Sequence, residues 1–206
     1  STIARFEQGF GPETLDSFEI RIKSSWLDNR LRANLAMFRS NYKNIQTNVQ
    51  TDPTNPAVTD VFNAGRARIQ GIELDLTAKP SPNLTLSANY AYLDAKYLKI
   101  TDPLTGADIT ANYVFVEAPR HTLTVGAEYR FPETPIGRFT ANVDYFMQSK
   151  KFSATGDARY VIGDYGLLNA RLTLSDIPVG VGKWRLSAFG KNLTDEKYYV
   201  AHYSAG

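Results

Sequence analysis

The sequence predicts an all-β fold, an antiparallel up-and-down transmembrane β-barrel to which this chain contributes about eight strands. Three observations carry the prediction. Segments of roughly ten residues alternate apolar and polar side chains, aromatic residues gather toward the ends of these segments, and the links between them are alternately short and long. Because successive side chains of a strand point to opposite faces, each segment offers one face to lipid and the other to water.

The first four strands are predicted over residues 14–26, 31–45, 67–79 and 84–96. In the first of them, Phe18, Ile20 and Ile22 alternate with charged residues, so one face suits hydrocarbon and the other suits water. The same alternation returns in the next three. The apolar sets are Phe18, Ile20, Ile22 and Trp26; Leu31, Ala33, Leu35 and Met37; Ile72, Leu74, Leu76 and Ala78; and Leu84, Leu86, Ala88, Tyr90 and Tyr92.

The last four strands are predicted over residues 120–131, 138–150, 166–174 and 184–193. They repeat the pattern, although the final two are shorter. Their apolar sets are Leu123, Val125, Ala127, Tyr129 and Phe131; Phe139, Ala141, Val143, Tyr145 and Met147; Leu168, Ala170, Leu172 and Leu174; and Trp184, Leu186 and Ala188.

A soluble β-sandwich is the alternative explanation of such alternation, and for one segment alone it is the better one. Eight repeats change this balance, since the polar positions are rich in Thr, Ser and Asn, as a hydrated lumen requires. Aromatic residues at the strand ends, such as Trp26, Tyr129 and Trp184, suit the membrane interface. The sandwich would instead pack Ile20 and Val125 in an enclosed apolar interior.

Composition excludes several classes of protein. Hydrophobic residues make up 43% of the chain and the mean hydropathy is -0.32, values that carry little information for a barrel because half of each strand faces water. No apolar run approaches the ~18 residues of a membrane helix. The formal net charge of +2 provides no field that would favour nucleic acid, and the absence of cysteine excludes disulfides and thiolate metal sites.

The link lengths predict the topology. We expect short links at 27–30, 80–83, 132–137 and 175–183, and long links at 46–66, 97–119 and 151–165. Outer-membrane barrels place short turns on the periplasmic side and long loops outside. Since the first and last links are both short, both ends of the chain are expected outside. We therefore expect residues 1–206 to be one part of a larger barrel.

Four segments resemble those of the TonB-dependent outer-membrane receptors, in the C-terminal part of their barrel. They occur in the expected order and are Gly11-Pro12-Glu13-Thr14-Leu15-Asp16-Ser17-Phe18-Glu19, Asn63-Ala64-Gly65-Arg66-Ala67-Arg68-Ile69-Gln70-Gly71-Ile72-Glu73, Ala118-Pro119-Arg120-His121-Thr122 and Asn192-Leu193-Thr194-Asp195-Glu196-Lys197-Tyr198. One departure is Arg21, where the family often has glycine. The resemblance covers most of the chain.

The resemblance implies a bacterial outer-membrane barrel of about 22 strands, of which this chain would supply the fourteenth to the twenty-first. It implies active uptake of a scarce nutrient, most often a ferric siderophore, with energy from TonB. Outer-membrane lipid and the TonB complex would be partners, and no resident cofactor or enzyme activity is implied. We expect the plug domain, the TonB-contacting segment and a last strand to lie outside this chain.

Two groups of residues are candidates for contact with a plug domain or a passing ligand. Arginine and aromatic side chains suit bulky anionic chelates, because a cation binds their oxygens and rings stack on the ligand. The alternative for the lumen charges is mutual pairing in a wet interior. The lumen candidates are Arg21, Glu73, Asp75, Glu128, Arg130, Asp144, Arg171 and Arg185, and the outer-loop candidates are Tyr113, Phe115, Arg159 and Tyr160.

Two other functions remain open from the sequence. A passive porin or adhesin barrel would lack a plug domain, and a barrel enzyme would need a catalytic cluster near one rim. Neither His121 nor His202 has a second histidine or a cysteine at metal-ligand spacing, which favours a plain loop or interface role. Asp102 and Asp108 fit a Pro/Gly turn better than a calcium site.

Overall fold

The computed structural model describes residues 11–50, 59–154 and 160–201. Almost all of its regular structure is strand. Within the described ranges, no helix combines the length and hydropathy needed to cross a bilayer. The elements are β1 (Thr14–Trp26), β2 (Leu31–Gln50), β3 (Thr59–Ser81), β4 (Leu84–Ile100), the short 3-10 helix η1 (Thr110–Asn112), β5 (His121–Arg130), β6 (Arg138–Gln148), β7 (Lys151–Phe152), β8 (Val161–Ile162), β9 (Tyr165–Val179) and β10 (Gly182–Gly190).

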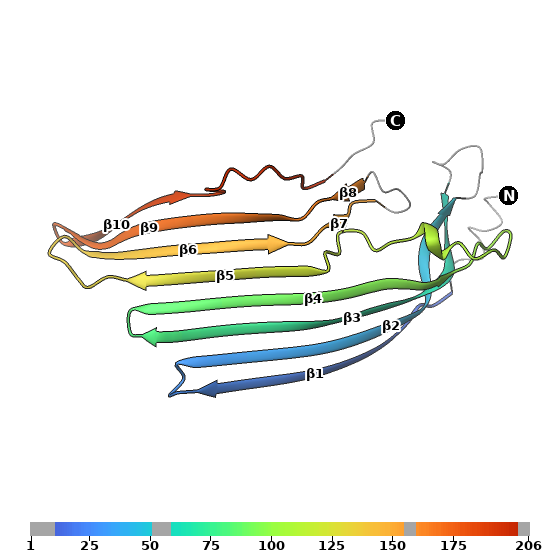
Figure 1. Cartoon of the computed structure of the whole chain (residues 1–206), viewed down its shortest axis with the longest axis horizontal. Coiled ribbons are helices and arrows are strands. Elements are labelled where there is room, and N and C mark those ends of the chain that lie inside the picture. Colours follow the sequence, from blue (N-terminus) through green and yellow to red (C-terminus); the bar gives the residue numbers. More distant parts are fainter. Residues whose placement is uncertain (1–10, 51–58, 155–159, 202–206) are drawn as a thin grey trace.

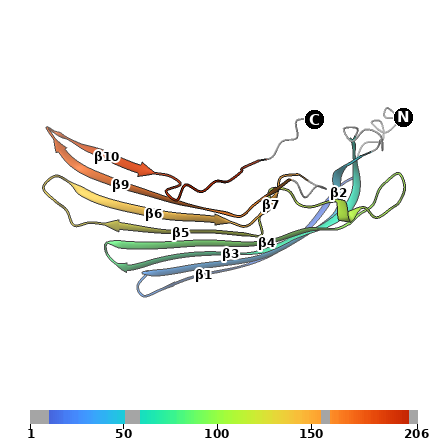
Figure 2. The same ribbon diagram turned by 45° about the horizontal axis from the view of Figure 1, so that its top comes forward.

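Eight strands form one antiparallel sheet in the order β1-β2-β3-β4-β5-β6-β9-β10, so nearly every strand pairs with its neighbours in sequence. The sheet is a single curved layer with no second layer packed on it (Figures 1 and 2). This confirms the predicted antiparallel up-and-down wall and its eight strands. The sheet is open in the described chain, because β1 and β10 each pair on one side alone.

The apolar side chains share one face because the register aligns them in rows across the sheet. Ile22 pairs with Leu35, Leu35 with Leu74 and Leu74 with Tyr90. Because paired residues of neighbouring strands lie on the same face, the apolar residues of all these strands share one face of the sheet and the polar residues share the other.

The enclosed apolar interior of a soluble sandwich is not found in the part of the chain that the structure describes. The buried hydrophobic residues there are Ala67, Ile100 and Ile162, all near the end of the sheet that carries the long links. Ile20, Val125 and Val143 instead remain 64%, 37% and 46% exposed. A face this apolar and this exposed fits contact with lipid acyl chains.

The strands run further than the alternation predicted. The predicted long link 46–66 is wrong over most of its length, because β2 continues to Gln50 and β3 begins at Thr59. Backbone pairing can continue outside the membrane without any apolar parity, and a bulge beside Asn44, whose φ is 57°, absorbs the irregularity. Similarly, β4 extends to Ile100, inside the predicted link 97–119.

The predicted link 175–183 is also wrong, since β9 reaches Val179 and β10 begins at Gly182. A tight connection forms there because Gly180 adopts a φ of 56°, which glycine tolerates without a steric penalty.

Two other predicted bounds also differ from the structure. The last strand, β10, ends at Gly190, three residues before the predicted end at residue 193. The predicted link 151–165 contains a small hairpin in which β7 pairs with β8.

The short connections all lie at one end of the sheet, on the left in Figure 1. The connections between β4 and β5 and between β6 and β9 lie at the opposite end, toward which the segment after β10 also runs (Figure 1). This arrangement follows the predicted alternation of short and long links. The end with the long connections is called the outer end below, following the usual polarity of outer-membrane barrels.

Two of the family-like segments meet at the outer end and hold β1, β2 and β3 together. The Asn63 side-chain amide donates to the backbone carbonyls of Gly11 and Asn44, each at 2.9 Å, and its oxygen accepts the Gly11 N–H at 2.8 Å. The Glu13 carboxylate accepts the backbone N–H of Gln46. These residues therefore close the ladder where the bulge interrupts it.

The lipid-facing assignment predicts opposite effects for a charge at two adjacent positions of β5. Val125→Arg places a guanidinium on the apolar face, where the free energy of folding into a bilayer should fall by about 2–4 kcal/mol if the site lies near the midplane. Thr124→Arg puts the same group on the polar face and should change stability far less. Urea unfolding of the full receptor in liposomes measures both values. Equal losses for the two variants would contradict the assignment.

Candidate functional site

The polar face of the sheet carries the predicted lumen residues. The register brings Arg21, Ala36, Glu73 and Ala91 into one cross-strand row and Lys23, Asn34, Asp75 and Asn89 into the next. The wall is hollowed here to a volume of about 530 Å³. Lumen-facing side chains that line the hollow include Arg21, Lys23, Asn34, Glu73, Asp75, Asn89, Thr122, Thr124 and Phe146.

Most lumen charges have partners on the wall itself. Arg21 forms an ion pair with Glu19 on the same strand, and Asn34 donates to Asp75 at 3.1 Å. The Glu128 carboxylate accepts from Arg130 at 2.8 Å and from Asn142 at 3.1 Å. Pairing across and along strands therefore neutralises part of the interior charge.

The remaining lumen candidates differ in their surroundings. Asp144 accepts a hydrogen bond from Asn169 at 2.7 Å. The Arg171 guanidinium lies 5.6 Å from the centre of the Phe189 ring, which is a cation–π distance. Arg185 lies in the irregular register between Trp184 and Leu186, and it has no ion pair among the described residues. The structure thus spreads the eight lumen candidates over the wall rather than gathering them at one point.

Three aromatic side chains meet at the outer end, on the lumen side of β4. Tyr97 stacks on Phe115 with ring centres 4.5 Å apart and meets the edge of Tyr113 at 5.9 Å. The Tyr113 hydroxyl donates to the backbone carbonyl of Asn48 at 3.0 Å, which ties the loop to β2. Burial raises the pKa of Tyr113, so the phenol stays neutral at physiological pH. We call Tyr97, Tyr113 and Phe115 the aromatic mouth.

Sequence reasoning identified Tyr113 and Phe115 but placed Tyr97 at the start of a loop. In the structure Tyr97 belongs to β4, because this strand continues to Ile100. The odd-numbered residues of β4 face the lumen. The odd position of Tyr97 was therefore the sequence signal that places its ring on the lumen face.

A second aromatic group was also missed. Phe146 lies 6.1 Å from Tyr165, and Tyr165 stacks on Tyr198 at 4.4 Å. Asn192 creates this contact, because its side chain closes a turn with Glu196 through bonds of 2.9 Å and 3.0 Å. The turn directs the chain after β10 back across the end of β9.

The two described outer connections dock on each other. Val116 forms a parallel bridge with Phe152, and the Glu117 N–H donates to the Phe152 carbonyl at 2.8 Å. Tyr160 is held through its own carbonyl, which accepts from Ser153 at 2.8 Å. Tyr160 therefore lies on the β7–β8 hairpin and not in the aromatic mouth, and Arg159 lies outside the described residues.

The Asp102–Asp108 segment is a hydrogen-bonded turn. The Asp102 carboxylate accepts from Thr105 at 2.7 Å and from the Leu104 N–H at 2.8 Å, and Asp108 accepts the Thr110 N–H at 2.9 Å. The described residues contain no group of three or more acidic or histidine side chains that could hold a metal ion. The local bonds explain both aspartates as turn residues.

The chain resembles known proteins over nearly its whole length. Residues 2–193 match the family described as TonB dependent receptor-like, beta-barrel. The "Ferric-pyoverdine M114 receptor PbuA" of Pseudomonas sp. (strain M114) is 28% identical over 187 residues, which are 89% of this chain and 21% of that protein. The "Probable TonB-dependent siderophore receptor PiuA" of Acinetobacter baumannii is 38% identical over 98 residues, 48% of this chain and 12% of that protein.

Solved structures show the same fold. The siderophore receptor PiuA from Acinetobacter baumannii aligns with a TM-score of 0.68 at 25% identity, over 96% of this chain and 27% of that chain. The ferric yersiniabactin uptake receptor FyuA from Yersinia pestis aligns with a TM-score of 0.67 at 16% identity, over 93% and 27%. The matched segment therefore makes up between 12% and 27% of these proteins and aligns with a portion of their barrels.

The Asp102 turn predicts a pH dependence. Hydrogen bonds from the Thr105 hydroxyl and the Leu104 N–H hold the pKa of Asp102 below its usual value. A carboxyl whose pKa is lower in the folded loop than in the unfolded loop stabilises the folded loop at every pH above the unfolded pKa, which is about 3.9 for aspartate. This stabilisation is lost as the pH falls through the pKa of the folded loop.

Amide hydrogen exchange of Leu104, corrected for its intrinsic rate, should therefore be constant from pH 7 to about 4 and accelerate below that. Asp102→Asn, which cannot titrate, should remove the acceleration and serves as the control. A loss of protection already between pH 7 and 5 would contradict the lowered pKa.

Proposed function

The chain belongs to the family of TonB-dependent receptor β-barrels, and from this premise we propose that the whole receptor imports a ferric siderophore with energy from TonB. The chain is a segment of a bacterial outer-membrane β-barrel wall. Uptake, cargo and the TonB partner belong to the whole receptor, of which this chain is one part.

The aromatic mouth is the observation that carries the choice of cargo. Tyr97, Tyr113 and Phe115 stand at the outer end on the lumen face, where a ligand arriving from outside would first meet the wall. Ferric siderophores are bulky chelates, often with flat aromatic or amide groups, and ring faces provide contact area with little loss of side-chain entropy. The names of PbuA and PiuA, which describe siderophore receptors, agree with this cargo.

The wall below the mouth suits a wet path that a plug domain fills and vacates. Its hydrogen-bonding groups, such as Asn34, Asn89 and Thr122, alternate with the paired charges around the 530 Å³ hollow. Cations already paired on the wall, such as Arg21 with Glu19, bind a passing anion weakly because their charge is partly compensated. We propose that Arg21, Glu73, Asp75, Glu128, Arg130, Asp144, Arg171 and Arg185 contact the plug or the cargo transiently.

The outer connections have a proposed role in first contact. Phe115 and Tyr160 lie on two connections that dock through Val116 and Phe152, so a ligand-induced shift of one connection is transmitted to the other. We propose that Arg159, on the same connection as Tyr160, adds a cation for anionic chelate oxygens.

The proposal is tested by removing the aromatic mouth in the whole receptor. Tyr97→Ala combined with Phe115→Ala should weaken binding of a ferric siderophore about tenfold, since each lost aromatic contact is worth about 0.5–1.5 kcal/mol. Tyr129→Ala with Phe131→Ala removes a comparable ring pair, 4.8 Å apart, near the opposite end of the sheet and serves as the matched control.

Binding is measured by tryptophan-fluorescence quenching with a ferric catecholate and a ferric hydroxamate, and uptake by accumulation of radioactive iron. Weaker binding and slower uptake in the mouth variant alone would support the proposal. Unchanged binding of both chelates, or passive uptake that persists without TonB, would contradict it and favour a passive barrel.

A further inference from the structure

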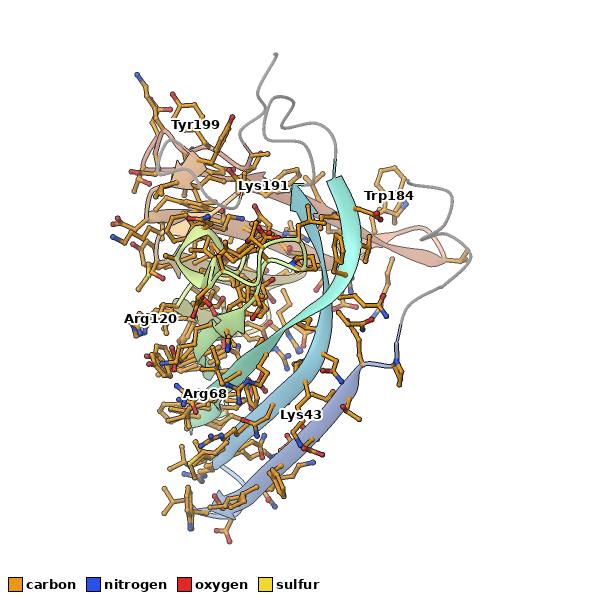
Figure 3. All side chains as sticks on the ribbon, turned by 90° about the vertical axis from the view of Figure 1, so that its right-hand side faces the viewer. Lys43, Arg68, Arg120, Trp184, Lys191 and Tyr199 are labelled. Atoms are coloured by element: carbon orange, nitrogen blue, oxygen red, sulfur yellow. The ribbon has the colours of Figure 1, made fainter. Side chains whose placement is uncertain are left out.

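One ring of the aromatic mouth is carried by a short segment that is fixed at both ends. Phe115 lies midway along residues 113–117 of the β4–β5 connection and stacks on Tyr97. Tyr113 fixes the first end through the bond from its hydroxyl to the Asn48 carbonyl of β2. In Figure 3, which views the sheet from its outer end, the pale green connection lies beside the cyan ribbon of β2 and β3.

The last end of the segment is fixed on the other outer connection. The Glu117 N–H donates to the Phe152 carbonyl of β7 at 2.8 Å, and the Glu117 carboxylate forms an ion pair with Lys151. Val116 adds the parallel bridge to Phe152. Glu117 and Lys151 are 34 positions apart in the sequence, so this anchor joins two separate connections.

Lys151 is the buried member of this ion pair. Its side chain is 12% exposed, whereas the lysines of the other described ion pairs are between 48% and 72% exposed. A cation that has lost most of its water depends on the carboxylate beside it. Glu117, by contrast, is 53% exposed and can be hydrated when its partner is removed. The two members therefore respond differently to substitution, and a test can use this difference.

The backbone at Glu117 also depends on the anchor. Its φ is 54°, in the left-handed region, which residues with a side chain adopt at a cost. Such a conformation persists only where the surrounding contacts hold it. The ion pair with Lys151 and the bond to the Phe152 carbonyl are such contacts. Release of the ion pair lets Glu117 return to a commoner conformation, which changes the direction of the chain two residues after Phe115.

The β7–β8 hairpin is a firm support for the anchor. Two residues before Lys151, the Ser149 N–H donates to the His121 carbonyl at 2.8 Å, and the His121 N–H donates to the Ser149 hydroxyl at 2.9 Å. Opposite Lys151 in β8, Ile162 is 1% exposed. Sheet bonds and apolar packing thus fix the position of Lys151, and Lys151 in turn determines where Glu117 lies.

From these contacts we infer that Lys151 is a positioning residue of the aromatic mouth, which acts through Glu117 to hold Phe115 against Tyr97. The inference rests on the proposed function, because this position matters for uptake only if the cargo contacts the rings of the mouth. It gives the β6–β9 connection a role in the affinity of a site that is formed by β4 and the β4–β5 connection.

The test compares Lys151→Met with Lys150→Met in the whole receptor. Both remove one cation, but Lys150 is an exposed neighbour. Lys151→Met keeps an apolar chain of similar length in the buried site and releases Glu117 to water. The position of the ring is read without any cargo, from the fluorine NMR signal of 4-fluorophenylalanine in place of Phe115. Tyr97→Leu provides the signal of the unstacked ring.

Lys151→Met should move the fluorine signal toward that of Tyr97→Leu, and Lys150→Met should leave it in place. With the natural Phe115, Lys151→Met should weaken binding of a ferric catecholate or a ferric hydroxamate about threefold to tenfold, mainly through faster dissociation. Lys151→Arg keeps the cation and should restore both the signal and the binding. Glu117→Gln should resemble Lys151→Met, and the double variant should lose little more than either single one, because both changes break the same contact.

An unmoved fluorine signal in Lys151→Met, or an equal shift in Lys150→Met, would overturn the positioning role. Additive losses from Glu117→Gln and Lys151→Met would overturn the assignment of that role to their ion pair. A shifted signal with unchanged binding of both chelates would support the action of Lys151 on Phe115 and overturn the proposed function of the mouth.

Discussion

The whole structure depends on the backbone hydrogen bonds of one sheet that separates two solvents. An unpaired N–H or C=O group costs several kcal/mol in hydrocarbon, so each strand must pair with its neighbours along the entire membrane span. This pairing fixes the register, and the register decides which solvent each side chain meets. The row from Ile22 through Leu35 and Leu74 to Tyr90 is apolar for this reason, and the neighbouring row from Lys23 to Asn89 is polar.

Function is arranged on this wall by height and by face. On the lumen face, paired charges and amides occupy the membrane level, and the aromatic mouth stands above them where the strands continue past the bilayer. On the outward face, the apolar rows end at the aromatic girdle, where the Tyr90 hydroxyl and the His121 ring nitrogen are 2.8 Å apart, and charged side chains such as Asp94 and Lys96 follow on the same parity of β4. The family-like segments hold neighbouring strands together at the outer end, for example through the hydrogen bonds from Asn63 to the carbonyls of Gly11 and Asn44.

The alternation of side chains predicted the strands well inside the membrane and poorly outside it. The first strand was predicted with its observed bounds, Thr14–Trp26. Lipid on one face and water on the other require apolar and polar side chains to alternate along a strand inside the membrane. Beyond the bilayer no solvent difference enforces the pattern, so the continuation of β2 to Gln50 and of β4 to Ile100 carries no periodic signal. Tyr97 was therefore assigned to a loop.

Contacts that depend on irregular backbone were not predictable either. The stack of Tyr198 on Tyr165 requires the turn that Asn192 closes, and periodicity gives no information on that turn. The most direct test of the account is a nitroxide scan of β4 from Leu84 to Lys96 in the liposome-embedded receptor, since the chain has no cysteine of its own. We expect collision with oxygen to peak at even positions up to Tyr92 and to give way to collision with a polar reagent at Asp94 and Lys96. Oxygen maxima at odd positions, or low access to both reagents at the even ones, would contradict a lipid-facing apolar parity.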